Sequence, residues 1–112
     1  NEVASMQVIG DVEARNVVLV DDMIDTAGTL CKAAELIKQK GANSVRAVCT
    51  HGILSGKAHE MITASVLEEV VISDSIPQKQ ENDKINILSV AGLFAKAVRR
   101  VHSHESISEL FI

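Results

Sequence analysis

The sequence predicts an α/β protein whose mostly parallel sheet is flanked by helices. Short segments rich in valine and isoleucine alternate along the chain with segments whose apolar residues recur at helical spacing. Strands that alternate with helices usually pair in parallel, because each helix crosses over a face of the sheet. The 112 residues fit one small domain. Since the chain starts at Asn1 without an initiator methionine, we expect residues 1–112 to be a piece of a longer protein.

The strands are predicted by apolar runs. Residues 17–20 are apolar throughout, which is typical of a strand covered on both faces of a sheet. A weaker strand is expected at residues 6–9, before a turn at Gly10. Similar segments predict further strands at residues 45–50, 70–72 and 85–88. The polar residues 73–84, which include the single proline, predict a long connection before the last strand.

Three helices are predicted by apolar residues spaced three and four apart. The clearest spans residues 29–40, and Gly41 follows it where a left-handed residue commonly ends a helix. A short second helix is expected at residues 58–65. Ser89 is suited to cap a third helix. The apolar face of that third helix consists of Val90, Leu93, Phe94, Ala97 and Val101.

Composition excludes several classes of partner. The formal net charge is −4, and no stripe of Lys and Arg is present to neutralise a phosphate backbone, so we expect no nucleic-acid partner. No apolar run approaches membrane-spanning length, so we expect no membrane partner. Cys31 and Cys49 lie inside helical and strand patterns without CxxC spacing, which predicts buried reduced thiols in a cytoplasmic protein.

The segment 17–30, VVLVDDMIDTAGTL, carries the clearest functional pattern. A buried strand is followed by Asp21, Asp22 and Asp25, and then by Thr-Ala-Gly-Thr at the start of a helix. A helix N-terminus offers unpaired N–H groups and a positive dipole end, which suit a phosphate. Carboxylates suit sugar hydroxyls or a divalent cation. Aspartates after a strand are often solvated turn residues, but this density of polar side chains favours a site for a phosphorylated sugar.

The same segment resembles the phosphoribosyl-pyrophosphate binding motif of the type I phosphoribosyltransferase fold. Three further segments are similar to the ribose-phosphate pyrophosphokinase family: THGILSG at 50–56, SDSIP at 73–77 and ESISELF at 105–111. The resemblance covers essentially the whole chain, and it implies the C-terminal domain of a longer two-domain enzyme. The implied reaction transfers the pyrophosphoryl group of ATP to ribose 5-phosphate with Mg²⁺, giving phosphoribosyl pyrophosphate and AMP for nucleotide biosynthesis.

The resemblance also implies roles for individual residues. The loop around the 5-phosphate would consist of Asp25, Thr26, Ala27, Gly28 and Thr29. Asp21 and Asp22 would hold the ribose hydroxyls, directly or through Mg²⁺. We expect Asp25 to cap the loop backbone instead of touching the anion. The family's catalytic Lys and Arg would precede Asn1, so we expect no catalytic residue here and no turnover by these residues alone.

Near its end, the chain resembles the family's regulatory segment, where phosphate activates and ADP inhibits. The residues implied are Ser106, Ser108 and Phe111. Glu109 departs from the family pattern, which commonly has an aromatic residue there, and Lys57 replaces the usual proline after Ser-Gly. The family resemblance further implies a homo-oligomer, a hexamer when the protein is full length.

Other patterns are weaker, and two alternative functions stay open. The segment 52–58 is one residue short of a P-loop, and His102 and His104 lack the partners of a metal site. His51 suits a structural hydrogen bond as well as a substrate contact. The alternatives are a salvage phosphoribosyltransferase, which would need a base-binding hood, and a non-catalytic regulator associated with the synthetase.

Overall fold

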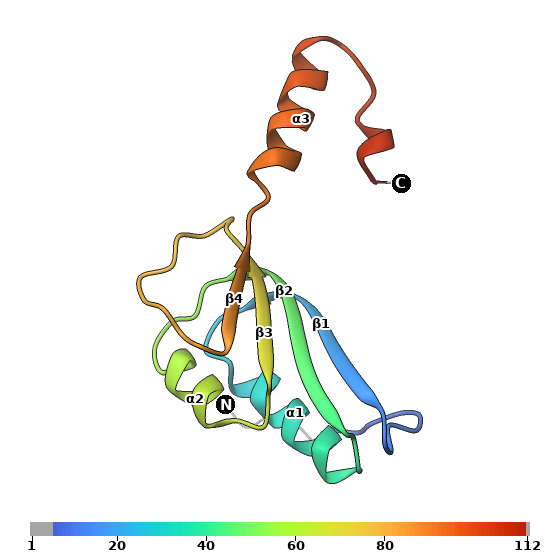
Figure 1. The fold of residues 1–112 in the computed structure, drawn as a ribbon, viewed down its shortest axis with the longest axis vertical. Coiled ribbons are helices and arrows are strands. Elements are labelled where there is room, and N and C mark those ends of the chain that lie inside the picture. Colours follow the sequence, from blue (N-terminus) through green and yellow to red (C-terminus); the bar gives the residue numbers. More distant parts are fainter. Residues whose placement is uncertain (1–5, 112) are drawn as a thin grey trace.

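The protein forms a four-stranded, all-parallel sheet with strand order β1-β2-β3-β4, as Figure 1 shows. The computed structural model describes residues 6–111. The strands are β1 (Asn16–Ile24), β2 (Ser44–Gly52), β3 (Glu69–Ser73) and β4 (Ile85–Leu88). The α/β class and the parallel sheet are therefore confirmed. Because all four strands run the same way, the loops after β1, β2 and β3 meet at one edge of the sheet.

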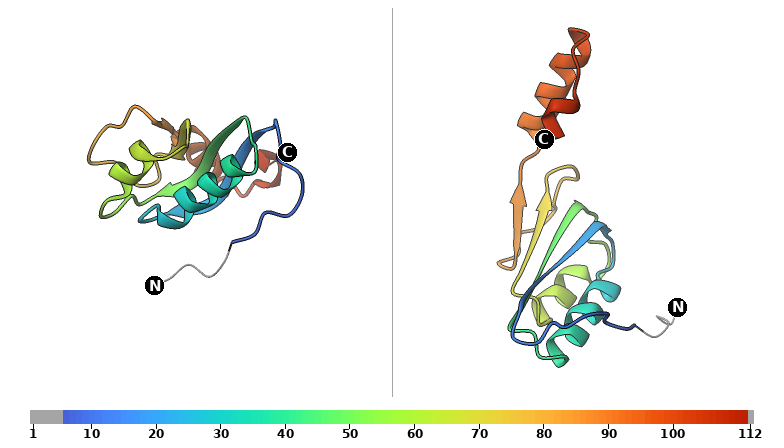
Figure 2. Two further views of the ribbon diagram at one scale, coloured as in Figure 1. Left: turned by 90° about the horizontal axis from the view of Figure 1, so that it is seen from below. Right: turned by 90° about the vertical axis from the view of Figure 1, so that its right-hand side faces the viewer.

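Two helices cover one face of this sheet. They are α1 (Gly28–Gln39) and α2 (Ala58–Ala64), and they lie on the same side of the strands in both views of Figure 2. The predicted stripe of α1 faces the core, where Ala34 is fully buried. Gly41, with φ of 97°, is the left-handed residue expected after this helix. The largest fully buried side chains are Ile62, Leu67, Ile72, Val45 and Val70.

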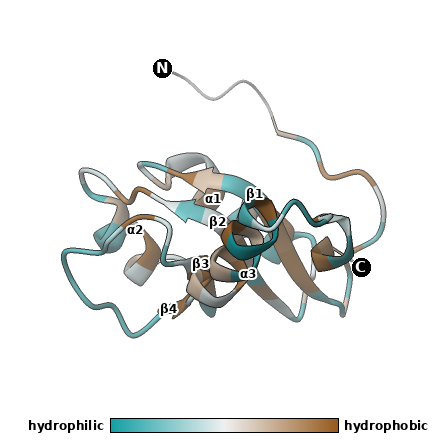
Figure 3. Ribbon diagram, turned by 90° about the horizontal axis from the view of Figure 1, so that it is seen from above, coloured by the Kyte–Doolittle hydropathy of each residue, from teal (hydrophilic) through white to brown (hydrophobic). Residues whose placement is uncertain are grey.

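The opposite face of the sheet is uncovered in the part of the chain that the structure describes. Val20 is 80% exposed, and Val18, Val48 and Leu88 are also exposed. Apolar residues are brown along β1 and β2 in Figure 3. The prediction that residues 17–20 are covered on both faces is therefore wrong within residues 6–111. The reason is that both packed helices lie on the other side of the sheet.

The third helix, α3 (Ala91–His102), follows β4 and projects away from the sheet (Figures 1 and 2). Its predicted apolar face is present, but none of its residues is buried. The short 3₁₀ helix η1 (Ser108–Phe111) folds back beside it, and the Arg100 guanidinium lies 3.3 Å from the Glu109 carboxylate. The N-cap position of α3 is Val90, one residue later than predicted, although the Ser89 hydroxyl accepts a bond from the Ala91 amide at 3.2 Å.

Two boundaries near the start of the chain differ from expectation. Residues 6–9 form no strand, because Ile9 is 94% exposed and has no neighbouring strand to pair with. Strand β1 continues to Ile24, so that Asp21 and Asp22 lie inside the strand and not in the loop after it. Within residues 6–111, no helix combines the length and the apolar character needed to span a bilayer.

Candidate functional site

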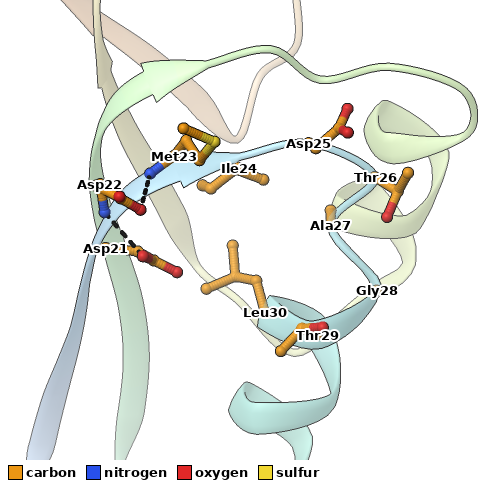
Figure 4. Close-up of a pocket in the computed structure, with 10 residues that line it drawn as sticks. All are labelled: Asp21, Asp22, Met23, Ile24, Asp25, Thr26, Ala27, Gly28, Thr29 and Leu30. Carbon is orange, nitrogen blue, oxygen red and sulfur yellow. Dashed lines mark hydrogen bonds between the residues drawn. The ribbon is translucent and has the colours of Figure 1, made fainter. Parts of the chain in front are cut away.

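A cavity of about 350 Å³ lies at the carboxyl end of β1, as Figure 4 shows. Ten consecutive residues, 21–30, line it. They comprise the last four residues of β1, the three-residue loop 25–27 and the first turn of α1. The structure therefore brings together all seven residues that the sequence predicted around a ribose 5-phosphate. A single continuous segment forms this lining because the strand passes almost directly into the helix.

The loop reaches the helix through Ala27, whose backbone is left-handed. Its φ is 70°, and its side chain is buried, with 4% exposed. A non-glycine residue in this region costs about 1–3 kcal/mol and persists when its surroundings hold it there, most often at functional sites. Ala27 is the N-cap of α1, and no side chain caps this position. The first N–H groups of α1 are consequently left for another acceptor.

Gly28 begins α1 with a backbone that does not require glycine. Its φ lies outside the left-handed region, and a Cβ placed there would meet the Met61 side chain at 3.9 Å, an ordinary van der Waals distance. Neither backbone conformation nor packing within the described chain explains why this position lacks a side chain. Its absence leaves the first amides of the helix open to close approach by a ligand.

Asp21 and Asp22 are exposed at the opposite wall of the cavity. One oxygen of each carboxylate accepts a bond from the next residue: Asp21 from the Asp22 amide at 2.8 Å, and Asp22 from the Met23 amide at 2.7 Å (dashed in Figure 4). These bonds fix both side chains and leave each second oxygen free. Among residues 6–111, no group of three or more His, Cys, Asp or Glu forms a metal site.

Asp25 is held by the neighbouring loop, between β2 and α2. Its carboxylate accepts a hydrogen bond from the Ser55 hydroxyl, and its carbonyl accepts one from the Ser55 amide at 3.0 Å. In Figure 4 the carboxylate points away from Gly28. The predicted capping of the loop backbone by Asp25 is therefore wrong, because the side chain is bonded across to a second loop. Sequence reasoning missed Ser55, whose one signal was its place in THGILSG.

His51 belongs to a structural network at the same edge. Its Nδ1 lies 2.7 Å from the Ser75 hydroxyl, and that hydroxyl also donates to the Thr50 carbonyl at 3.2 Å. These bonds favour the structural role over substrate contact. Nearby, Asp74 accepts a bond from the Val90 amide at 2.9 Å. Hydrogen bonds from Ser89 and Val90 lower the pKa of the Asp74 carboxyl.

The predicted regulatory residues lie elsewhere. Ser108 and Phe111 are the first and last residues of η1, and Ser106 lies just before it. This segment lies beyond α3, far from the cavity at the end of β1 (Figure 1). Phe111 is 73% exposed. The two predicted sites therefore do not meet within this chain. Of the two thiols, Cys49 is buried as predicted and Cys31 is half-buried; both are free.

The family model described as "Phosphoribosyl synthetase-associated domain" matches residues 1–112. The chain belongs to this family. A ribose-phosphate pyrophosphokinase of Campylobacter jejuni is 54% identical over the whole chain, which covers 36% of that protein. One from Porphyromonas gingivalis is 50% identical over 99% of the chain, and again 36% of that protein is covered. The chain thus spans about a third of the length of these curated relatives.

The fold is likewise that of a solved relative. The crystal structure of phosphoribosylpyrophosphate synthetase from Mycobacterium smegmatis superimposes with a TM-score of 0.86 at 33% identity. The match covers 92% of this domain and 35% of that chain. The resemblance seen in the sequence is therefore confirmed at the level of the family and the fold.

Proposed function

We propose that this domain is the ribose 5-phosphate binding part of a ribose-phosphate pyrophosphokinase. The whole enzyme would transfer the pyrophosphoryl group of ATP to ribose 5-phosphate, giving phosphoribosyl pyrophosphate and AMP. One observation carries the proposal. The uncapped amides at the start of α1, which follow the left-handed Ala27, face the two fixed carboxylates of Asp21 and Asp22 across one cavity. The names of the 54%-identical relatives agree with it.

The phosphate would lie at the start of α1. The amides there have no side-chain cap, and the missing side chain of Gly28 lets an anion approach them. The Thr26 and Thr29 hydroxyls line the same cavity and add donors. Asp25 does not oppose the anion, because its carboxylate is turned toward Ser55. Local charge and local geometry therefore both favour this end of the cavity for the phosphate.

The ribose hydroxyls would lie at the other end, against Asp21 and Asp22. Each carboxylate keeps one oxygen free to accept a hydroxyl proton or to bind a cation. Two carboxylates fit Mg²⁺, which proteins commonly hold through one or two carboxylates together with substrate oxygens and water. When bound, Mg²⁺ would neutralise charge on the phosphate groups. This chain's own contribution is to hold the sugar so that its anomeric hydroxyl stays in one place.

Phosphoryl-group transfer depends on positioning and on charge stabilisation more than on covalent catalysis. The cavity of this domain supplies the positioning. We propose that the catalytic Lys and Arg belong to the remainder of a longer two-domain protein, of which this is the C-terminal domain. The exposed sheet face at Val18, Val20 and Leu88 and the unburied α3 support such a remainder, since single domains rarely expose so much contiguous apolar surface.

We also propose how the full protein is regulated, where it is located and how it assembles. Phosphate and ADP would regulate it through Ser106, Ser108 and Phe111, and the full-length protein would be a cytoplasmic homo-oligomer, a hexamer as in the family. The description "synthetase-associated" favours a second candidate, a non-catalytic regulator with the same fold. The two candidates differ in turnover: the enzyme forms AMP from ATP and ribose 5-phosphate, and the regulator does not.

Calorimetric titration of the 112-residue chain tests the proposed binding. We expect ribose 5-phosphate to bind, Mg²⁺ to strengthen binding, and ribose without phosphate to bind at least about tenfold more weakly, because it makes no contact with the helix amides. Equal affinity for ribose and ribose 5-phosphate would contradict the proposal. Formation of AMP by these residues alone would contradict the placement of the catalytic residues outside the chain.

A further inference from the structure

The loop between β2 and α2, residues 53–57, is bonded along its length to the cavity loop. The Ile53 and Leu54 amides both donate to the Ile24 carbonyl, at 2.9 and 3.1 Å, and the Ser55 amide donates to the Asp25 carbonyl at 3.0 Å. The two loops therefore form one hydrogen-bonded unit, although about thirty residues separate them in the sequence. Ser55 adds the one side-chain bond between them that reaches a charged group of the cavity lining, the carboxylate of Asp25.

The β2–α2 loop is itself rigidly placed. Leu54 is left-handed, with φ of 53°, and its side chain is buried with 8% exposed. Gly52, just before it, approaches Ile72 so closely that an added Cβ would lie 2.7 Å from the Ile72 side chain. The Gly52 carbonyl also accepts a bond from the Gln78 side chain at 2.7 Å. Ser55 thus directly follows a segment, residues 52–54, that packing and hydrogen bonds hold in place.

We propose that Ser55 is a positioning residue for the phosphate-binding loop, acting by holding the Asp25 carboxylate away from the anion; this rests on the proposed function. Released from Ser55, the Asp25 side chain would rotate freely beside Thr26 and Ala27 and bring a negative charge near the phosphate. The Ser55 amide also fixes the backbone of Asp25, because it donates a hydrogen bond to the Asp25 carbonyl. Because a peptide unit is planar, a carbonyl of Asp25 held toward Ser55 directs the Thr26 N–H in the opposite sense.

The test compares Ser55→Ala with Ser55→Thr in the 112-residue chain, using ribose 5-phosphate as the probe. Ser55→Ala removes the hydroxyl but keeps the backbone bond. Loss of a hydrogen bond to a charged group predicts an affinity about five- to tenfold weaker. Ser55→Thr keeps a hydroxyl and should stay near the original affinity. Ser103→Ala, at an exposed serine after α3, is the matched control and should change nothing.

A double variant separates positioning from general damage to the fold. In Ser55→Ala, the change Asp25→Asn removes the misplaced charge and should restore most of the lost affinity. A general structural defect would not be restored by this second change. Failure of Asp25→Asn to restore binding would therefore overturn the proposal, as would unchanged affinity in Ser55→Ala.

A measurement without ligand keeps this inference distinct from the proposed function. In the free protein, Ser55→Ala should average the Hα–Hβ couplings of Asp25 over several χ1 rotamers, while those of Asp22, whose carboxylate keeps its bond from the Met23 amide, hold their values. If the original chain does not bind ribose 5-phosphate, the proposed function fails, and unchanged couplings at Asp25 then overturn the role of Ser55 as well. Averaging confined to Asp25 supports that role whether or not the sugar binds.

Discussion

The sulfur of Cys49 lies within hydrogen-bond reach of two carbonyl oxygens, that of Asp22 across the β1–β2 pair at 3.4 Å and that of His51 on its own strand at 3.2 Å. In the parallel register, Cys49 lies opposite Asp21. The acidic end of β1 is therefore backed by a buried, neutral side chain of the adjacent strand. Burial raises the pKa of the Cys49 thiol, and the nearby Asp21 and Asp22 carboxylates raise it further.

Cys49 should resist alkylation in the folded chain. Its raised pKa keeps the thiol protonated, and the thiolate is the form that reacts with the reagent. In addition, the residue is only 2% exposed, so the reagent has little access to the sulfur. Cys31, half-buried, has a pKa raised by its own burial but is more accessible. At pH 8 we expect iodoacetamide to modify Cys31 at least about tenfold faster than Cys49, as measured by peptide mass spectrometry. Equal rates would contradict the packing of β2 described here.

Gly28→Ala should impair binding without damaging the fold. A Cβ at this position meets only ordinary contacts within the chain, and alanine favours helices over glycine by up to about 1 kcal/mol. Thermal unfolding should therefore show unchanged or higher stability, while ribose 5-phosphate binds about tenfold more weakly or worse, because the methyl group occupies the approach to the amides.

Gly92→Ala is the matched control for that variant. Gly92 also lies in the first turn of a helix, α3, and an added Cβ there has no neighbour within 4 Å. Its change should leave ribose 5-phosphate affinity unaltered. Loss of affinity in both variants would mean that the effect of Gly28→Ala is not local to the cavity.

The sequence predicts those features of the fold and of the cavity that depend on residues close together in the chain. The helix at 29–40 and its left-handed Gly41 were predicted well, because spacing and a C-terminal glycine are local signals. The seven residues expected around the sugar phosphate line one cavity for a related reason: all of them fall within the consecutive residues 21–30. The bond from Ser55 to Asp25 joins positions thirty residues apart, and only the parallel pairing of β1 and β2 brings them together.

The wrong predictions share a different cause. An apolar run such as residues 17–20 indicates that apolar neighbours exist, but not which stretch of polypeptide supplies them. In residues 6–111 one face of that strand has no cover, and α3 likewise keeps its apolar side exposed. The strand expected at 6–9 failed because β-propensity alone does not provide a pairing partner.

Two large-to-small substitutions compare the face of the sheet that is packed against α1 and α2 with the face that is uncovered. Ile62→Ala, at a fully buried position, should lower the free energy of unfolding by about 2–5 kcal/mol in urea titrations. Val20→Ala, at a position 80% exposed, should change it by less than about 0.5 kcal/mol in the 112-residue chain. In a longer protein that contains this domain, we expect Val20→Ala to become destabilising. A null effect there would contradict our proposal that the remainder covers this face.

The most direct test of the account is a ¹H–¹⁵N titration of the 112-residue chain with ribose 5-phosphate in the presence of Mg²⁺. The central claim is that the loop and first turn of α1 hold the phosphate, so the largest amide shifts should fall on residues 26–30, with smaller ones at Asp21 and Asp22. Ribose alone should leave residues 26–30 unmoved. Shifts that are absent from residues 26–30, or concentrated at η1 or on the open sheet face, would contradict the claim.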